Sequence, residues 1–290
     1  MASKINIIGC GQAAGSLARL WVETGAVNVG CVLNRSESST RAAVGRVGAG
    51  KPVTAFSDME AADFWLIGTN DDQIKPVAKL LRERRVNREG ALVFHLAGRF
   101  GLDVLDSLDD GKTLLAALHP VRSLTHAALS LEDFAATACV AEGDPAALAA
   151  LQPLVTSIGG TWLPVASIDR GLYHASVSII SNITKAVAWK AQKWQKKAGL
   201  PEETAATVTH QLLASTMDDL FRSGARQSIT GPVVRGDTRT IEAHIQAINT
   251  SHPEDLEVYR VLARTVLELA QERGDLDEQA LRRFEFLLGR

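Results

Sequence analysis

The 290-residue sequence has few cysteines, little net charge, and no internal repeat or low-complexity tail. Its cysteines, Cys10, Cys31 and Cys139, lack the spacing of a metal site and lie within or beside predicted strands. We therefore expect buried thiols in a reducing compartment. The net charge of −2 gives no electrostatic reason to expect nucleic acid or a membrane surface as a partner.

Membrane and export signals are also lacking. No basic-then-apolar leader precedes the first predicted strand, so we expect a cytoplasmic protein. The longest uncharged run, Pro145 to Ile168, is long enough to span a bilayer, but Pro153, Gly159-Gly160 and Pro164 interrupt it. We predict a helix and a strand there. With 46% hydrophobic and 22% charged residues, the chain is ordinary globular material, long enough for two domains.

What the sequence does contain is a glycine-rich turn near its start. The apolar segment Lys4 to Ile8 runs into Gly9-Cys10-Gly11, and good helix formers follow from Ser16 to Trp21. This order of strand, tight turn and helix is typical of a corner that binds the pyrophosphate of a dinucleotide. The residues expected to bind the cofactor in this turn are Gly9, Gly11, Gln12, Ala13 and Ala14, with Ala14 also letting the helix pack closely on the strand.

The end of the second predicted strand, Val27 to Leu33, bears on which nucleotide binds. It is followed by Asn34-Arg35-Ser36, where an acidic residue would bind the ribose 2′-hydroxyl of NAD or of S-adenosylmethionine. Arg35 with Ser36 instead suits a 2′-phosphate, so we predict NADP(H) as the cofactor. The alternative is that Arg35 is an ordinary solvated loop arginine.

The first half of the chain alternates strands and helices, as a mostly parallel sheet requires. Helices are predicted at 39–48, 71–85 and 145–157, and further strands at 52–55, 64–68, 91–95, 113–118, 137–141 and 161–163. From about Asp169 only helices are predicted, at 171–198, 201–221, 238–248 and 256–273, with a last one after Asp275. Capping boxes are predicted at Ser251 with Glu254 and at Asp275 with Glu278. We therefore expect an α/β fold, with a Rossmann-like domain over residues 1–168 and an all-helical domain over 169–290.

Ligands of such sheets bind outside the carboxyl ends of the strands. Thr69 and Asn70 follow the fourth strand and are expected near the nicotinamide ribose, while His95 follows the fifth strand and His119 ends the sixth. His95 is a candidate acid or polar anchor. The alternative is that His95 is a satisfied structural group, and His119-Pro120 also makes a good rigid corner.

The long helix carries a second candidate site. On a wheel of 3.6 residues, His174, Ser178, Asn182 and Lys185 form one polar stripe among apolar positions, so we expect the helix to be buried. Lys185 could then polarise a carbonyl or donate a proton, with Asn182 holding the substrate oxygen. Alternatively, the stripe packs against a neighbouring helix and Lys185 marks where the helix reaches solvent.

The third candidate is Thr230-Gly231-Pro232-Val233-Val234-Arg235-Gly236-Asp237. Arg235 could clamp a carboxylate there, but a loop between helices with a cap at Asp237 would use the same residues.

These motifs together resemble an uncharacterised family that joins a Rossmann-like NADP-binding domain to Domain of Unknown Function 2520. The resemblance rests on the Gly9–Gly15 turn, His95-x-x-Gly98, His119-Pro120, Ser181-Asn182 and the Thr230–Asp237 string. That family is similar in layout to ketopantoate reductase, pyrroline-5-carboxylate reductase and the β-hydroxyacid dehydrogenases. The resemblance implies an NADP-linked reductase that forms a homodimer through its helical domain. In some of these relatives a lysine precedes an asparagine by one turn, whereas here Asn182 precedes Lys185.

We therefore predict an NADP-dependent oxidoreductase acting on a C=O or C=N carbon of a small, carboxylated metabolite. His95, Asn182 and Lys185 are the predicted catalytic residues, and no metal is expected. The competing hypothesis is a non-catalytic NADP sensor or partner-binding protein on the same fold. A methyltransferase is disfavoured by Asn34-Arg35 in place of an acidic residue.

Overall fold

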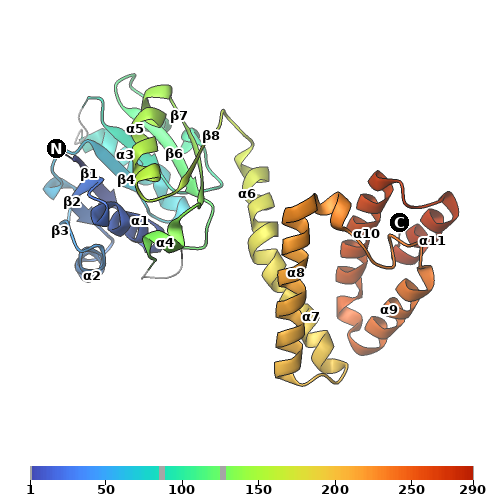
Figure 1. The fold of residues 1–290 in the computed structure, drawn as a ribbon. Coiled ribbons are helices and arrows are strands. Elements are labelled where there is room, and N and C mark those ends of the chain that lie inside the picture. Colours follow the sequence, from blue (N-terminus) through green and yellow to red (C-terminus); the bar gives the residue numbers. More distant parts are fainter. Residues whose placement is uncertain (1, 85–88, 125–128, 290) are drawn as a thin grey trace. The chain divides into compact units, whose positions relative to one another are not determined.

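The computed structural model describes residues 2–84, 89–124 and 129–289, and the chain divides into two compact units (Figure 1). The first unit, Met1–Ser181, contains all the strands of the described residues, and the second, Asn182–Arg290, contains only helices. An α/β sheet unit and an all-helical unit were both expected, so the predicted fold class is confirmed.

In chain order, the first unit is built from β1 (Ser3–Ile8), α1 (Gln12–Glu23), β2 (Val27–Leu33), α2 (Glu37–Val47), β3 (Lys51–Val53), β4 (Phe64–Ile67), α3 (Asp71–Arg84), β5 (Leu92–His95), β6 (Leu114–Pro120), α4 (Leu131–Phe134), β7 (Ala138–Gly143), α5 (Pro145–Ser157), β8 (Thr161–Pro164) and α6 (Arg170–Ser178). Two 3₁₀ segments lie at Phe56–Asp58 and Leu102–Leu108. The predicted end of the third helix, Arg85, lies outside the described residues.

One sheet organises the first unit. Within the described residues its strand order is β3-β2-β1-β4-β5-β6-β7-β8, and every neighbouring pair is parallel except β6 with β7. The carboxyl ends of β1, β2, β4, β5 and β6 therefore lie along one edge. The chain order reverses beside β1, so the crevice where such folds bind ligands is expected at this edge, between β1 and β4.

Apolar side chains alternate between the two faces of the sheet. Ile7 and Leu66 belong to a core that includes α1 and α5, whereas Ile8 and Ile67 belong to a second core that includes α3. Helices therefore cover both faces (Figure 1), which explains why β4 reads as an uninterrupted apolar run.

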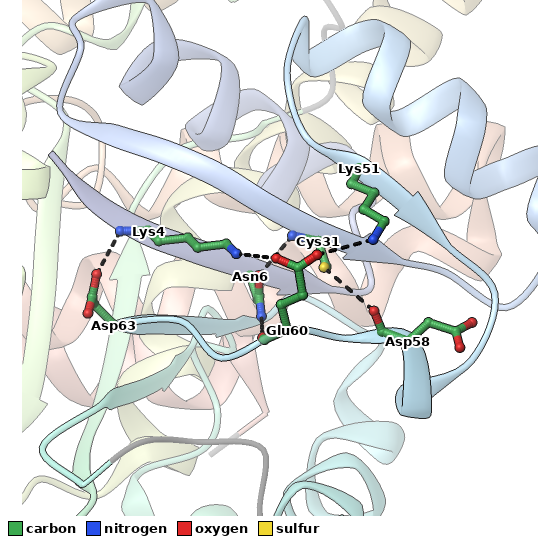
Figure 2. Close-up of polar contacts among 7 residues, drawn as sticks. All are labelled: Lys4, Asn6, Cys31, Lys51, Asp58, Glu60 and Asp63. Carbon is green, nitrogen blue, oxygen red and sulfur yellow. Dashed lines mark hydrogen bonds and ion pairs between the residues drawn. The ribbon is translucent and has the colours of Figure 1, made fainter.

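A buried asparagine interrupts the pairing of β1 with β2. Asn6 is fully buried, and the register shifts beside it, so that Ile5 faces Val29 while Ile7 faces Val32. The side chain of Asn6 bonds to backbone groups on both sides of it (Figure 2). Its Oδ1 accepts from the N–H of Cys31 at 2.8 Å, and its Nδ2 donates to the carbonyl of Glu60 at 2.6 Å. This side chain therefore stabilises a β-bulge inside the sheet.

All three cysteines are free and buried, as predicted. Burial raises the pKa of Cys10 to about 11 and that of Cys139 to about 12, so both stay protonated thiols at neutral pH.

The second unit is a helical assembly. A π turn at Ile179–Ile183 joins α6 to α7 (Thr184–Lys197), and α8 (Glu202–Ser228), α9 (Thr238–Ser251), a 3₁₀ turn at Pro253–Asp255, α10 (Leu256–Arg273) and α11 (Glu278–Leu288) follow. Its core contains Ile241, Leu267, Phe284 and Leu288. Asp255 ties α7 to the start of α10, because its carboxylate accepts from Lys190 at 2.5 Å and from the indole N–H of Trp194 at 2.9 Å.

Two predicted capping boxes are wrong. Ser251 is the last residue of α9, and among the described residues no side chain caps α10. Asp277, not Asp275, caps α11 by accepting from the N–H of Ala280, while Asp275 pairs with Arg273. Ser251 lies in the last turn of α9, so its backbone is helical and cannot adopt the extended conformation of a cap. Asp275 lies two residues before the N-cap position of α11, which Asp277 occupies.

The long predicted helix also differs from expectation. Ile179–Ile183 is π-helical, so the four-residue spacing that placed His174, Ser178, Asn182 and Lys185 on one stripe does not hold through it. In the single chain Leu172 is 70% and Ile180 77% exposed, so the predicted burial of this helix is wrong within one chain. The segment α8 consists of two helices that meet at a kink, where Gly224 has a non-helical φ of 75° and ψ of 162°, so the first of them ends close to the predicted Phe221.

No helix among the described residues has the length and apolarity needed to cross a bilayer.

Candidate functional site

The glycine turn after β1 has the geometry that its sequence predicts. Gly9 has a φ of 81°, and a Cβ built on it would lie 2.5 Å from the backbone nitrogen of Thr69, so only glycine fits there. A Cβ built on Gly11, by contrast, would meet nothing within 4 Å. Gly11 is the N-cap of α1 and provides no side-chain cap, so the first N–H groups of α1 remain available to an anion.

The helix α1 packs tightly against the end of β4. A Cβ on Gly68 would lie 2.4 Å from the Cβ of Ala14 and 2.6 Å from the carbonyl oxygen of Gly9. Ala14 is fully buried, so its small side chain allows this close packing, as the sequence predicted.

Asn34 connects the glycine turn to α2. Its Oδ1 accepts from the N–H of Cys10 at 2.6 Å, and its Nδ2 donates to the carbonyl of Ser39 at 3.0 Å. The hydroxyl of Ser36 accepts from the N–H of Ser39 and so caps α2. The side chains of Asn34 and Ser36 therefore stabilise the conformation of the glycine turn and of the start of α2.

Two cavities adjoin this turn. The first has a volume of about 590 Å³ and is lined by Gly9, Cys10, Gly11, Asn34, Arg35, Ser36, Ser39, Ala42, Arg46, Gly68, Thr69, Asn70 and Gln73. The second, of about 500 Å³, shares Gly9, Asn34, Arg35, Thr69, Asn70 and Gln73 and adds Ile8, Leu33, Phe56, Asp72 and Val77. The first cavity is thus polar and is lined by two arginines, whereas the second cavity is partly apolar.

Most of the predicted cofactor residues lie around these cavities, namely Gly9, Gly11, Asn34, Arg35, Ser36, Thr69 and Asn70. Gln12, Ala13 and Ala14 do not line them. Sequence reasoning missed Arg46, which lies on the face of α2 that also carries Ser39 and Ala42. The helical spacing of three and seven residues from Ser39 could have revealed it.

An unsatisfied oxygen lies in the same region. The hydroxyl of Thr69 is buried and has no hydrogen-bond partner among the described residues. Buried polar groups are nearly always paired, so this hydroxyl is suited to bind a ligand. The open space at Gly11, the free N–H groups of α1 and the two arginines all fit a phosphorylated nucleotide.

A group of aromatic rings lies at the carboxyl ends of β5 and β6. Nδ1 of His119 is 2.8 Å from the phenol oxygen of Tyr173, and the ring of His119 lies edge-on to those of Tyr173 and His174 at centroid distances of 5.6 and 6.2 Å. A Cβ on Gly98 would lie 2.8 Å from His119 and 2.9 Å from His174. We call His119, Tyr173, His174 and Gly98 the ring cluster; the sequence ranked His119 below His95 and did not single out Tyr173.

Two members of the ring cluster, His119 and Tyr173, are uncharged at neutral pH. Burial, with smaller contributions from His174 and Arg170, lowers the pKa of His119 to about 4. Burial also raises the pKa of Tyr173. At neutral pH the cluster therefore presents an uncharged imidazole bonded to a protonated phenol.

A buried ion pair lies beside the ring cluster. Arg170 begins α6, and its Nε donates to the carboxylate of Glu142 in β7 at 2.8 Å, with the two side chains only 6% and 11% exposed. The guanidinium also lies 5.9 Å from the centre of the Tyr173 ring. Nη1 of Arg170 has no hydrogen-bond partner among the described residues, so the pair is only partly satisfied.

His95, predicted to be catalytic, is fully buried. Its Nδ1 accepts from the N–H of Ala97 at 3.2 Å, so Nε2 carries the proton and donates to the carbonyl of Gly101 at 2.9 Å. Burial lowers the pKa of His95. Both ring nitrogens are therefore engaged by backbone, which favours the structural interpretation of His95, and its catalytic role stays a prediction.

The other two predicted catalytic residues belong to the second unit. Asn182 lies in the π turn and Lys185 in the first turn of α7, and both are exposed in the single chain. In the Thr230–Asp237 loop, Asp237 caps α9 by accepting from the N–H of Thr240 at 3.1 Å, and the N–H of Arg235 donates to Gly231. The capping alternative for this loop is thus confirmed, and a role for the Arg235 side chain stays a prediction.

Two family models match the chain, with residues 2–120 matching the Rossmann-like domain and residues 137–266 matching the Domain of unknown function (DUF2520). The chain joins a Rossmann-like domain to a DUF2520 domain. The resemblance drawn from the motifs is therefore confirmed. Among curated proteins, none matches this sequence.

Several solved structures are similar in fold. A Thermotoga maritima protein has a TM-score of 0.70 and 24% identity, covering 92% of this chain and 98% of that one. An imine reductase from a Pseudomonas species has a TM-score of 0.67 and 15% identity, covering 98% and 99%. A pyrroline-5-carboxylate reductase from Coxiella burnetii has a TM-score of 0.59 and 18% identity, covering 99% of both chains. At these identities the likeness shows the fold alone.

Proposed function

We propose that the protein is an oxidoreductase that uses a nicotinamide dinucleotide. The observation that carries this proposal is the site around Gly9 and Gly11, which combines a bare glycine turn, free N–H groups at the start of α1 and a cavity of about 590 Å³ lined by two arginines. The imine reductase and the pyrroline-5-carboxylate reductase named above support the same class of activity.

Within that class we favour NADP(H) over NAD(H). Arg35 and Ser36 follow the end of β2, where an NAD-binding fold usually carries a carboxylate for the ribose 2′-hydroxyl. No Asp or Glu is among the described residues that line the larger cavity. A 2′-phosphate would find cationic partners there and no like charge.

The proposed substrate is a small, carboxylated metabolite with a C=O or C=N bond. A bound nicotinamide would supply or accept hydride, and the protein would orient the substrate and move a proton at its heteroatom. His95, Asn182 and Lys185 are the predicted groups for this chemistry. The ring cluster adds a second set in the first unit, because the protonated phenol of Tyr173 and the neutral imidazole of His119 can both exchange a proton at a carboxyl-end position of the sheet.

We also propose a homodimer formed through the helical unit, in the cytoplasm. In the single chain this unit exposes large apolar side chains, with exposed fractions of 58% at Trp189, 62% at Leu212, 82% at Phe221 and 83% at Phe286. Exposed apolar residues in such number commonly mark a protein interface. Sedimentation of the wild type and of Leu212→Asp tests this: the wild type is expected as a dimer and the variant as a weakened one, and a monomeric wild type at micromolar concentration contradicts the proposal.

Titration with NADPH, NADH and S-adenosylmethionine tests the cofactor proposal. We expect the wild type to bind NADPH most tightly. Gly11→Ala should keep its fold but lose binding, because its methyl group enters the open space where the pyrophosphate is expected. Gly45→Ala, on the exposed side of α2, is the matched control and should bind as the wild type does. Tighter binding of either of the other two nucleotides would contradict the proposal.

Turnover distinguishes the enzyme from the sensor. NADPH oxidation is measured against a panel of small 2-oxo acids and cyclic imino acids. Oxidation of NADPH with any member supports the reductase, whereas NADPH binding with no turnover of the panel supports the non-catalytic sensor.

A further inference from the structure

The polar cavity beside the glycine turn has a wall contributed by α2. Ser39, Ala42 and Arg46 lie on one face of this helix and all three line the cavity. The guanidinium of Arg46 lies close to the glycine turn, since its Nη2 donates to the carbonyl oxygen of Cys10 at 3.4 Å. A bond of this length is weak, and it is the one hydrogen bond that the Arg46 side chain makes among the described residues.

Arg46 differs from its neighbours, because none of the described residues is an acidic partner for it. Arg41, one turn earlier on α2, pairs with Glu37 at 2.7 Å, and Arg19 on α1 pairs with Glu23. Within the described part of the chain, neither Arg35 nor Arg46 forms an ion pair, and both line the same cavity. Two uncompensated guanidinium groups around one cavity produce a positive potential that favours a multiply charged anion.

We infer that Arg46, together with Arg35, binds the phosphate on the ribose 2′-oxygen of NADP(H), which makes Arg46 a residue that determines the choice between NADP(H) and NAD(H). This inference rests on the proposed function and deepens it. The pyrophosphate is expected at the open N-terminus of α1, over Gly11, which leaves the side of the cavity formed by Arg35, Ser39 and Arg46 for the additional phosphate.

Binding constants for NADPH and NADH test the inference. They are measured by fluorescence for the wild type, Arg46→Gln, Arg46→Lys and Arg41→Gln. Arg46→Gln should weaken the binding of NADPH about tenfold and leave the binding of NADH nearly unchanged, because one charge-assisted contact to the 2′-phosphate is lost. Arg46→Lys should retain part of the NADPH affinity, because it keeps the charge but loses the planar fork. Arg41→Gln, on the same helix but already paired with Glu37, should behave as the wild type.

Binding of adenosine 2′,5′-bisphosphate and of adenosine 5′-monophosphate measures the effect of Arg46 on the 2′-phosphate without the nicotinamide half of the cofactor. Arg46→Gln should weaken the binding of the bisphosphate and leave the binding of the monophosphate unchanged. Equal weakening of NADPH and NADH would show that Arg46 serves the pyrophosphate and would overturn the inference, as would unchanged NADPH binding by Arg46→Gln. A wild type that binds neither dinucleotide would instead overturn the proposed function itself. Should Arg46→Gln fail to fold, the NADPH-to-NADH ratio of Arg46→Lys decides.

Discussion

The phenol oxygen of Tyr173 lies 2.8 Å from Nδ1 of His119, although 54 positions separate the two residues in the chain. Tyr173 comes from the first turns of α6 and His119 from the carboxyl end of β6. The bond therefore joins the helix that leads out of the first unit to the edge of the sheet where ligands of this fold bind. The burial of His119 at this place also produces a measurable pH dependence.

His119 should make stability depend on acid pH. Its pKa is lowered to about 4 in the folded protein, whereas an unfolded histidine has a pKa of about 6.5. The unfolded chain binds the proton more readily, so the stabilisation from neutral His119 is complete above about pH 6.5 and is lost as pH falls towards 4. Between these two pH values, the free energy of unfolding of the wild type should fall by about 3 kcal/mol more than that of His119→Asn.

Urea unfolding at a series of pH values checks this expectation. His210→Asn, at an exposed position on α8, should follow the wild-type curve. Parallel curves for the wild type and His119→Asn would show that His119 titrates normally.

The buried pair of Arg170 and Glu142 should tolerate loss of both charges better than loss of one. Both side chains are nearly buried, so Arg170→Met alone leaves an uncompensated carboxylate and should cost about 3 kcal/mol or more in the free energy of unfolding. The double variant Glu142→Gln with Arg170→Met should recover much of this loss. Arg41→Ala, which breaks an exposed pair, should change unfolding little. A double variant as unstable as the single one would contradict this account.

Asn6 should be essential to the sheet because it satisfies two buried backbone groups. Asn6→Leu leaves the N–H of Cys31 and the carbonyl of Glu60 without their partner, and we expect a loss of about 2 to 4 kcal/mol. Asn28→Ala, at an exposed position on β2, is the control. Thermal unfolding measures both, and a small effect of Asn6→Leu would mean that β1 and β2 can pair without the bulge.

Two glycine substitutions should change the stability of the protein in opposite directions. Gly98→Ala places a methyl group against the rings of His119 and His174, within 2.9 Å of both, so it should destabilise the protein and shift the NMR signals of His119. Gly45→Ala, inside α2 with nothing within 4 Å, should stabilise by about 0.5 to 1 kcal/mol. If Gly98→Ala left the His119 signals unchanged, the ring cluster would not be packed as described.

The elements of the first unit could be predicted because their signals are local. The apolar runs of β2 and β4, the glycine turn at Gly9 and the amphipathic pattern of α3 each depend on residues adjacent in the chain. The grouping of Asn34, Thr69 and the glycine turn also followed from the sequence, because the carboxyl ends of neighbouring parallel strands share an edge.

Side-chain partners between distant segments could not be predicted in the same way. Asp277 and Asp275 have equally good capping chemistry, and only the position at which α11 begins selects Asp277. His95 and His119 both lie at the carboxyl ends of strands, yet backbone groups engage both nitrogens of His95 while His119 contacts a tyrosine from α6. Arg46 reaches the cavity only because α2 packs beside the glycine turn.

The sequence by itself determined the α/β order, the phosphate-binding type of turn, the small residue at Ala14 and the change to helices after the sheet. These follow from periodicity and from the backbone freedom of glycine, which act over a few residues. Only the tertiary structure decided that Asn6 bridges a bulge, that Arg46 joins Arg35 at one cavity and that Tyr173 meets His119. Such contacts depend on strand order, register and helix packing, which combine segments far apart in the chain.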